Sequence, residues 1–169
     1  LEEIEVDLSI DTKKSPCFIC SWNRRKMIFE KTRELECNKV ALGHHKDDAI
    51  QTVLMNMIYH GSISSLPQKL SMFDGRIRLI RPLLFIPEKE LTYYAPLRTF
   101  KKQEKSCPYV DTTKRESIKQ LIREMDSLNR NARRNIFQAM DNIYEEYLPD
   151  IKKKKKISSE KPSSEKQSL

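Results

Sequence analysis

The residues best suited to chemistry lie in one short polar block, Gly43-His44-His45-Lys46-Asp47-Asp48. The block follows an apolar run at 40–42, which predicts a buried parallel strand, and precedes apolar residues at helical spacing from Ile50 to Ile58. Ligands of open α/β sheets bind at such a place, beyond the carboxyl end of a strand. One Asp there would be explained as a helix cap that complements the helix dipole. Two adjacent Asp preceded by two His exceed what a cap needs, so the block is predicted to be a functional site.

The cysteines form the second set of residues with chemical potential. The chain has four, and Cys17, Cys20 and Cys107 are each predicted to lie in a polar loop just before a helix. Cys17-x-x-Cys20 is a ligand pair for zinc or an iron–sulfur cluster, and also a redox dithiol. A structural zinc site would need a fourth ligand, either a histidine of the polar block or Cys37. Three thiolates with an open position suit a [4Fe–4S] cluster instead, and spacing alone ranks the two equally, ahead of unligated thiols.

Basic residues follow the first cysteine pair. Residues 24–26 are expected in the first turns of a helix that has Ser21 as its N-cap and runs to about Glu36. The helix dipole disfavours cations at that end, so either a solvated face or an anionic partner would explain them. Arg81, beside Pro82, could clamp an anion, although taken alone it is predicted to be a surface arginine.

The surrounding elements can be predicted from periodicity and turn residues. Gly61 should end the helix that follows the polar block. The segments Lys69–Phe73 and Arg76–Ile80 flank Asp74-Gly75 and predict a β-hairpin.

Three further helices are predicted downstream. The first is short and opens at Pro87-Glu88, the second is opened by the capping box Thr113-x-x-Glu116, and the third runs from about Asn131 to Pro149. Their apolar residues at helical spacing are expected to face a core: Leu91, Tyr94 and Ala95; Ile118, Leu121, Ile122 and Met125; Ile136, Met140, Ile143, Tyr144 and Tyr147.

Composition suits one domain with appendages. The chain has 169 residues, 38% of them hydrophobic, and a net charge of +8. Residues 151–169 contain seven Lys against two Glu, so most of that charge lies in a tail that cannot bury anything and is expected to be disordered. Residues 1–16 alternate like an edge strand or an extended arm, which leaves 17–150 as the domain. The basic balance is therefore weak evidence for nucleic acid.

Location and completeness can also be predicted. No apolar run approaches the roughly 20 residues of a membrane span. No secretory signal is recognisable, and a Cys-x-x-Cys without one favours a reducing, cytoplasmic setting. The three glycines, Gly43, Gly61 and Gly75, are too far apart to build a phosphate loop. If the protein uses a nucleotide, its phosphate loop is expected upstream of Leu1.

Together these motifs resemble the tRNA 2-thiocytidine synthetases (TtcA-type), within the ATP pyrophosphatase (PP-loop) tRNA thiolases. The matching blocks run in family order over residues 17–149. They are Cys17-x-x-Cys20-Ser21-x-x-Arg24-Arg25, Lys39 to Asp48, Leu66-Pro67-x-Lys69-Leu70, Ile80-Arg81-Pro82-Leu83, Cys107, Arg115-x-x-Ile118-Lys119, and Ile136-Phe137-x-Ala139-Met140-x-Asn142-Ile143.

The resemblance implies a fold and a reaction. The fold would be α/β, a partial adenine-nucleotide α-hydrolase-like (HUP, Rossmann-like) parallel sheet with C-terminal helices, here without its first strands and its Ser-Gly-Gly-x-Asp-Ser phosphate loop. In such enzymes ATP adenylates the C2 oxygen of a tRNA cytidine, and sulfur then displaces AMP to give 2-thiocytidine. The family also implies a sulfur donor such as a cysteine desulfurase, and dimerisation. Without the phosphate loop, these 169 residues alone are not expected to hydrolyse ATP.

The same resemblance implies roles for individual residues. Three thiolates would hold a [4Fe–4S] cluster: Cys17, Cys20 and Cys107. Five residues would lie at ATP and Mg²⁺: Gly43, His44, Asp47, Asp48 and Arg81. Asp48 is assigned to catalysis together with Arg24, which would stabilise an anion at the mouth of the cluster. Three basic residues would contact tRNA: Arg25, Lys26 and Arg115.

Two departures keep other functions open. Cys107 stands alone in Ser-Cys-Pro-Tyr where the family has a second Cys-x-x-Cys, and Gln51-Thr52 replaces the usual Glu-Thr. One alternative is a zinc-stabilised RNA-binding module without catalysis. Another is a different PP-loop tRNA-modifying enzyme, such as a tRNA-lysidine synthetase or a 2-thiouridine synthetase. The last alternative is a degenerate remnant that binds no ligand.

Overall fold

The computed structural model describes residues 15–100 and 114–149. The predicted N-terminal arm and lysine-rich tail lie almost wholly outside these residues, as do Cys107 and Thr113. The described elements, in chain order, are helix α1 (Pro16–Glu34), strand β1 (Lys39–Ala41), helix α2 (Lys46–His60), strands β2 (Lys69–Met72) and β3 (Ile77–Ile80), helix α3 (Glu88–Tyr94), a 3₁₀ turn η1 (Ala95–Leu97), helices α4 (Lys114–Leu128) and α5 (Ala132–Ala139), and a 3₁₀ turn η3 (Glu145–Tyr147).

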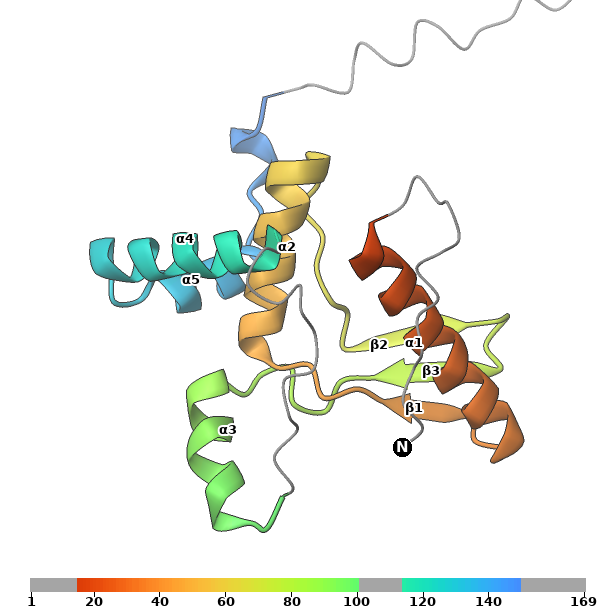
Figure 1. The fold of residues 1–169 in the computed structure, drawn as a ribbon. Coiled ribbons are helices and arrows are strands. Elements are labelled where there is room, and N and C mark those ends of the chain that lie inside the picture. Colours follow the sequence, from red (N-terminus) through yellow and green to blue (C-terminus); the bar gives the residue numbers. More distant parts are fainter. Residues whose placement is uncertain (1–14, 101–113, 150–169) are drawn as a thin grey trace, which may run out of the picture.

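The strands form one small mixed sheet in the order β1-β3-β2 (Figure 1). β1 runs parallel to β3, and β2 pairs antiparallel with β3 through the predicted hairpin. The hairpin turn is tight because residues 73–75 all have positive φ, and Gly75 there adopts it without strain. β1 was predicted to be buried, which is wrong for the described residues: Lys39 and Ala41 are exposed. Within these residues β1 is an edge strand, hydrogen-bonded on one side only.

Helix α1 lies across the sheet and begins earlier than predicted (Figure 1). Its N-cap is Ser15, whose Oγ accepts from the Phe18 N–H at 3.4 Å, and Pro16 occupies the first helical position, where a missing N–H costs nothing. The prediction of Ser21 as the cap is therefore wrong, because Ser21 lies inside the helix and donates to the Phe18 carbonyl. The aromatic rings of Phe29 and Phe73 meet edge-on at 5.1 Å and join α1 to the hairpin.

The described core lies where α4 and α5 pack on α2, away from the sheet (Figure 1). Its buried residues come from the predicted stripes of α2 and α4 and are Ile50, Val53, Leu54, Ile118 and Ile122. Partly buried side chains surround them and include Leu121, Met125, Ile136, Phe137 and Met140.

Several predicted core residues lie at the surface instead. Met57 and Ile58 are exposed because the last turns of α2 extend past α4 (Figure 1). α3 buries no residue: Tyr94 and Ala95 are exposed and Leu91 is half-buried. The last helix ends at Ala139 rather than near Pro149, because the N–H groups of Asp141 and Asn142 turn back to carbonyls three residues earlier. The predicted stripe therefore breaks there, and its distal residues are exposed: Ile143, Tyr144 and Tyr147.

Among the described residues, no helix is both long and apolar enough to cross a membrane.

Candidate functional site

The polar block lies where the sequence placed it, between the carboxyl end of β1 and the first turn of α2. His45 is the extended N-cap residue, and its N–H donates to Oδ2 of Asp48 at 3.0 Å, which is half of a capping box. Gly61 ends the helix in the left-handed conformation, with φ of 61°. The two aspartates therefore sit in the first turn of α2, as predicted, but their surroundings differ.

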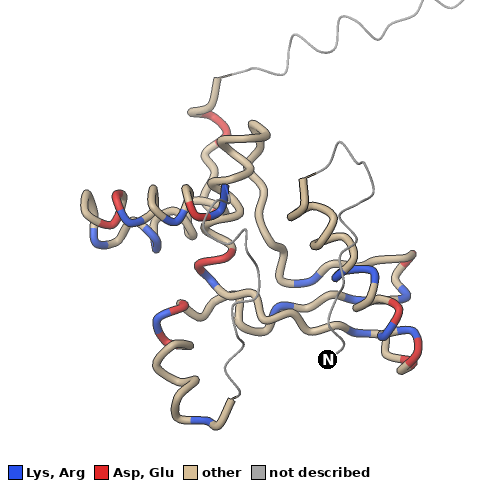
Figure 2. The backbone as a smooth tube through the Cα atoms, viewed as in Figure 1, with Lys and Arg blue, Asp and Glu red and all other residues tan. Residues whose placement is uncertain are grey.

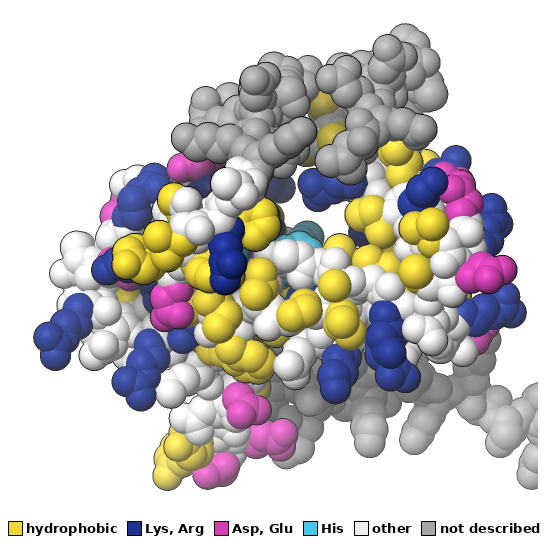
Figure 3. Space-filling view, turned by 90° about the horizontal axis from the view of Figure 1, so that it is seen from below, with side chains coloured by type: hydrophobic (Ala, Val, Ile, Leu, Met, Phe, Trp, Pro, Cys, Tyr) yellow, Lys and Arg dark blue, Asp and Glu magenta, His cyan; other side chains and the backbone are white. Residues whose placement is uncertain are grey.

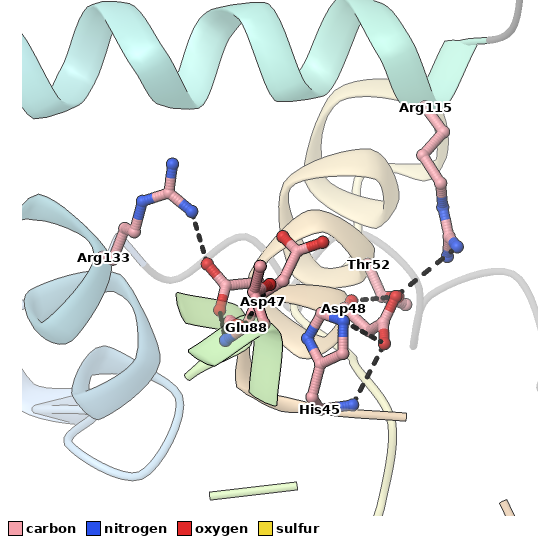
Figure 4. Close-up of polar contacts among 8 residues, drawn as sticks. His45, Asp47, Asp48, Thr52, Glu88, Arg115 and Arg133 are labelled. Carbon is pink, nitrogen blue, oxygen red and sulfur yellow. Dashed lines mark hydrogen bonds and ion pairs between the residues drawn. The ribbon is translucent and has the colours of Figure 1, made fainter. Parts of the chain in front are cut away.

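Asp47 is a structural carboxylate (Figure 4). Its side chain is only 7% exposed. Oδ2 accepts from the Glu88 N–H at 2.7 Å, and Oδ1 pairs with the Arg133 guanidinium, which also binds Asp126 at 2.9 Å. Burial works to lower the pKa of Arg133, but its hydrogen bonds to Asp126 and Asp47 outweigh that effect and raise it. Asp47 thus ties α2 to the start of α3 and to α5.

Asp48 is the more approachable carboxylate. Besides the His45 N–H, it has the His45 Nε2 at 3.4 Å from Oδ2 and Nη1 of Arg115 at 3.6 Å from Oδ1 (Figure 4). The Arg115 contact is long, and that side chain is 45% exposed. One oxygen of Asp48 is therefore held by the backbone, while the other faces the exposed Arg115. Asp48 could thus release Arg115 and bind a ligand instead.

His44 shows that basic side chains converge on this place. Burial lowers the pKa of His44, the charges of Arg81, Arg115 and Arg24 lower it further, and Asp48 alone opposes them. Three arginines from α1, the end of β3 and α4 thus act on one histidine next to one aspartate. Figure 3 shows a histidine side chain in a hollow flanked by basic and hydrophobic groups. The excess of positive charge suits an anionic ligand.

Arg81 is buried, against the prediction of a surface arginine, with 6% of the residue exposed. Its Nη1 donates to the Pro67 carbonyl, and among the described residues its Nε is buried without a hydrogen-bond partner. Burial lowers the pKa of Arg81, and no ion pair with an acidic group is formed in the described part of the chain. The alternation of β3 could have shown this burial, because Arg81 follows the buried Leu79 by two residues.

The first cysteine pair lies in the opening turns of α1, not in a loop before it. Both thiols are exposed, and residues three apart on a helix share one face. The amino end of a helix also favours thiolates. This donor set fits two ligands of an iron–sulfur cluster and two ligands of zinc equally well. Cys107, the predicted third ligand, lies outside the described residues, and within them no three His, Cys, Asp or Glu side chains form a metal-binding group.

The remaining predicted site residues can also be placed. Gly43 is exposed at the end of β1. Arg24, Arg25 and Lys26 lie in the third turn of α1 rather than its first turns, because the helix starts at Pro16. Arg25 donates from Nε to the Ser21 carbonyl at 3.1 Å, and Lys26 lies 3.8 Å from Glu30.

Two polar residues near the site, the half-buried Arg133 and the buried Gln51, were not predicted. Arg133 has no local motif, but it precedes Ile136 and Phe137 by three and four residues and so shares their inward face. Gln51 is 4% exposed, and its Oε1 has no partner among the described residues. Gln51 lies one turn beyond Asp48, at the position where the sequence departs from the family pattern.

A hollow elsewhere among the described residues does not coincide with these groups. It has a volume of about 750 Å³ and is lined by residues that include Ala49, Leu84, Phe85, Phe137 and Met140. None of the predicted site residues lines it.

Comparisons with known proteins place the chain in a family. The PP-loop domain family matches residues 21–125. Among curated proteins, the chain is 37% identical to the tRNA-cytidine(32) 2-sulfurtransferase of Paracidovorax citrulli over 138 residues, covering 81% of this chain and 44% of the relative. It is 40% identical to the enzyme of the same name from Burkholderia vietnamiensis over 81% of this chain and 41% of the relative. The chain thus spans about half the length of the curated relatives it matches.

A solved structure is also similar. It is the U34-tRNA thiolase NcsA from Methanococcus maripaludis with its [4Fe-4S] cluster, with a TM-score of 0.63 and 25% identity, covering 80% of this chain and 46% of the other.

Proposed function

The chain belongs to the PP-loop domain family, and from that premise we propose that it takes part in ATP-dependent tRNA thiolation that forms 2-thiocytidine. The observation that carries this proposal is the site beyond the carboxyl end of β1, where Arg115 lies 3.6 Å from Asp48, and burial together with the charges of Arg81, Arg115 and Arg24 lowers the pKa of His44. Relatives covering most of this chain are tRNA-cytidine(32) 2-sulfurtransferases, which supports the choice of base.

The charges of the site suit the adenylation step. Transfer of AMP from ATP to a base oxygen releases pyrophosphate, builds negative charge on the phosphates and makes a poor leaving oxygen into a good one. Arginines placed beforehand in a partly buried site stabilise such charge without reorganising. In this proposal Arg81 and Arg24 stabilise the anion, and Asp48 lies at Mg²⁺, which would neutralise phosphate charge when bound. Asp47 keeps its predicted place at ATP, but its contacts favour holding the first turn of α2 in position.

The cysteines supply the second half of the proposal. Cys17, Cys20 and Cys107 would hold a [4Fe–4S] cluster, whose remaining iron offers a site for the sulfur to be transferred. The exposed thiols of the pair, on one face of α1, support this assignment. Arg24 lies one turn beyond Cys20 on the same helix and also acts on His44, so α1 connects the thiols with the anion site.

The other parts of the proposal follow from the family. The tRNA would meet Arg25, Lys26 and Arg115, a cysteine desulfurase would donate sulfur, and the enzyme would be a cytoplasmic homodimer. The 169 residues contain no glycine-rich phosphate loop, so the groups that bind the ATP phosphates opposite Asp48 would come from outside them. Residues 17–150 would form the part of the PP-loop domain that this chain supplies, between an arm at 1–16 and a tail at 151–169.

Metal identity separates this function from a zinc-stabilised RNA-binding module. Anaerobic reconstitution with iron and sulfide should give a coloured protein with four irons per chain. Cys17→Ser should lose the colour and the iron. Cys37→Ser is the matched control, because Cys37 is also an exposed free thiol but follows α1 rather than opening it, and it should keep both. A colourless protein that retains zinc would contradict the thiolase proposal.

A further inference from the structure

The chain has a single tryptophan, and it is at the surface of α1. Trp22 is 52% exposed, and its ring has the Lys26 ammonium 5.9 Å from the centroid. Tryptophan has a large apolar ring with a polar N–H and is enriched where a protein contacts a partner. Nothing in the predicted or proposed site uses this side chain.

The charge around Trp22 indicates what kind of partner would cover it. Residues 15–29 contain Arg24, Arg25 and Lys26 and no acidic residue. Figure 2 shows this basic stretch on α1, which passes over the strands. The next acidic residue along α1 is Glu30, which pairs with Lys26 at 3.8 Å. The aromatic ring is thus set in a basic surface, which complements a polyanion that also carries flat apolar groups.

We propose that Trp22 stacks on an unpaired base of the RNA while Arg25 and Lys26 hold the adjoining phosphates. Single-stranded nucleic acid is bound by this combination of aromatic stacking and basic side chains. The inference rests on the proposed function and adds a base-contacting residue to it. Trp22 lies two residues beyond Cys20, about 200° around the helix from it, so the stacked base would lie on a different face of α1 from the proposed sulfur centre.

Because Trp22 is the only tryptophan, its own fluorescence reports the contact. The complete chain is titrated with an anticodon stem-loop RNA and, in parallel, with the same stem carrying an abasic loop. The two RNAs have the same phosphates, so binding through electrostatic contacts alone would give both the same affinity. Stacking predicts strong quenching of indole emission by the first RNA and little by the second.

Affinity measured with a labelled stem-loop gives an independent readout. Trp22→Leu should bind about tenfold more weakly, within the range found for one base–aromatic stack, and Trp22→Phe should recover most of the loss. Tyr93→Leu is the matched control, since Tyr93 is 77% exposed on α3, where Lys89 is flanked by two glutamates. That variant should bind as the native chain does. Unchanged circular dichroism would show that each variant is folded.

The outcomes separate this inference from the proposed function. If the stem-loop binds but emission is not quenched and Trp22→Leu binds normally, the stacking role is wrong while RNA binding stands. If the native chain binds neither RNA, the RNA-binding part of the proposed function fails as well. If Trp22→Leu instead abolishes self-association seen by sedimentation, the ring is a protein interface and the inference is overturned.

Discussion

Asp47→Asn should cost far more stability than the same change at the adjacent Asp48. One carboxylate oxygen of Asp47 accepts a hydrogen bond from the Glu88 N–H and the other accepts one from Arg133, and the side chain is 7% exposed. Asparagine has one acceptor oxygen, so its amide group must face either that N–H or the guanidinium. One buried donor then meets another donor, and the negative charge between α3 and α5 is lost.

The magnitude can be worked out from these contacts. A hydrogen bond to a charged group contributes about 1.5–3 kcal/mol, and a buried group left unsatisfied costs about 1–3 kcal/mol. Breaking a fully buried ion pair costs about 3–5 kcal/mol, but Arg133 is 40% exposed, so water screens part of that loss. We expect Asp47→Asn to lower the free energy of unfolding by about 3 kcal/mol.

Asp48→Asn is the matched control. The asparagine oxygen can still accept from the His45 N–H, so the cap survives, and the long pair with the exposed Arg115 contributes at most about 1 kcal/mol. Urea unfolding followed by far-ultraviolet circular dichroism gives both free energies. Equal losses in the two variants would show that Asp47 does not hold α2, α3 and α5 together, and would refute the division of roles between the two aspartates.

Three further predictions concern the site and its supports. Burial lowers the pKa of His44 in the folded protein below its ordinary 6.5, so the stability His44 contributes is complete above that pH and falls as the pH drops through it. The free energy of unfolding of the native chain should therefore fall between about pH 7.5 and about pH 5.5, and in His44→Asn it should fall less. The same slope against pH in both proteins would be evidence that His44 is not buried. Ile50→Ala should destabilise by about 2–5 kcal/mol, whereas Ile58→Ala, on the exposed end of the same helix, should cost less than about 1 kcal/mol in the same urea assay. Ser15→Ala should cost about 1 kcal/mol through loss of the N-cap and Ser21→Ala much less, and the reverse order would restore Ser21 as the start of α1.

The parts of the fold that could be predicted depend on local signals. The apolar period after the polar block located α2, and Gly61 located its end, because a left-handed residue at that position is a property of a few neighbouring residues. Asp74-Gly75 located the hairpin for the same reason. The start of α1 was missed because Ser15 and Ser21 both satisfy the N-cap pattern, and only Ser15 is followed by a proline, which favours the first helical position.

The parts that could not be predicted depend on contacts between distant segments. The pair between Asp47 and Arg133 joins residues 86 positions apart, and no local pattern specifies it. The burial of Arg81 similarly depends on the Pro67 carbonyl, 14 positions away. The stripe of the last helix was extended too far because periodicity continues in the sequence beyond Ala139, while the core formed by α2, α4 and α5 ends there.

The most direct test of the central claim is the 2-thiocytidine content of tRNA in the organism that makes this protein. Nucleosides from digested tRNA would be quantified by mass spectrometry after Asp48→Asn or Cys17→Ser replaces the native residue in the gene. The account predicts that each variant loses 2-thiocytidine, while Cys37→Ser keeps it at the native level. Native amounts of 2-thiocytidine in the first two variants would contradict the claim that the aspartate site and the thiol pair together carry out thiolation.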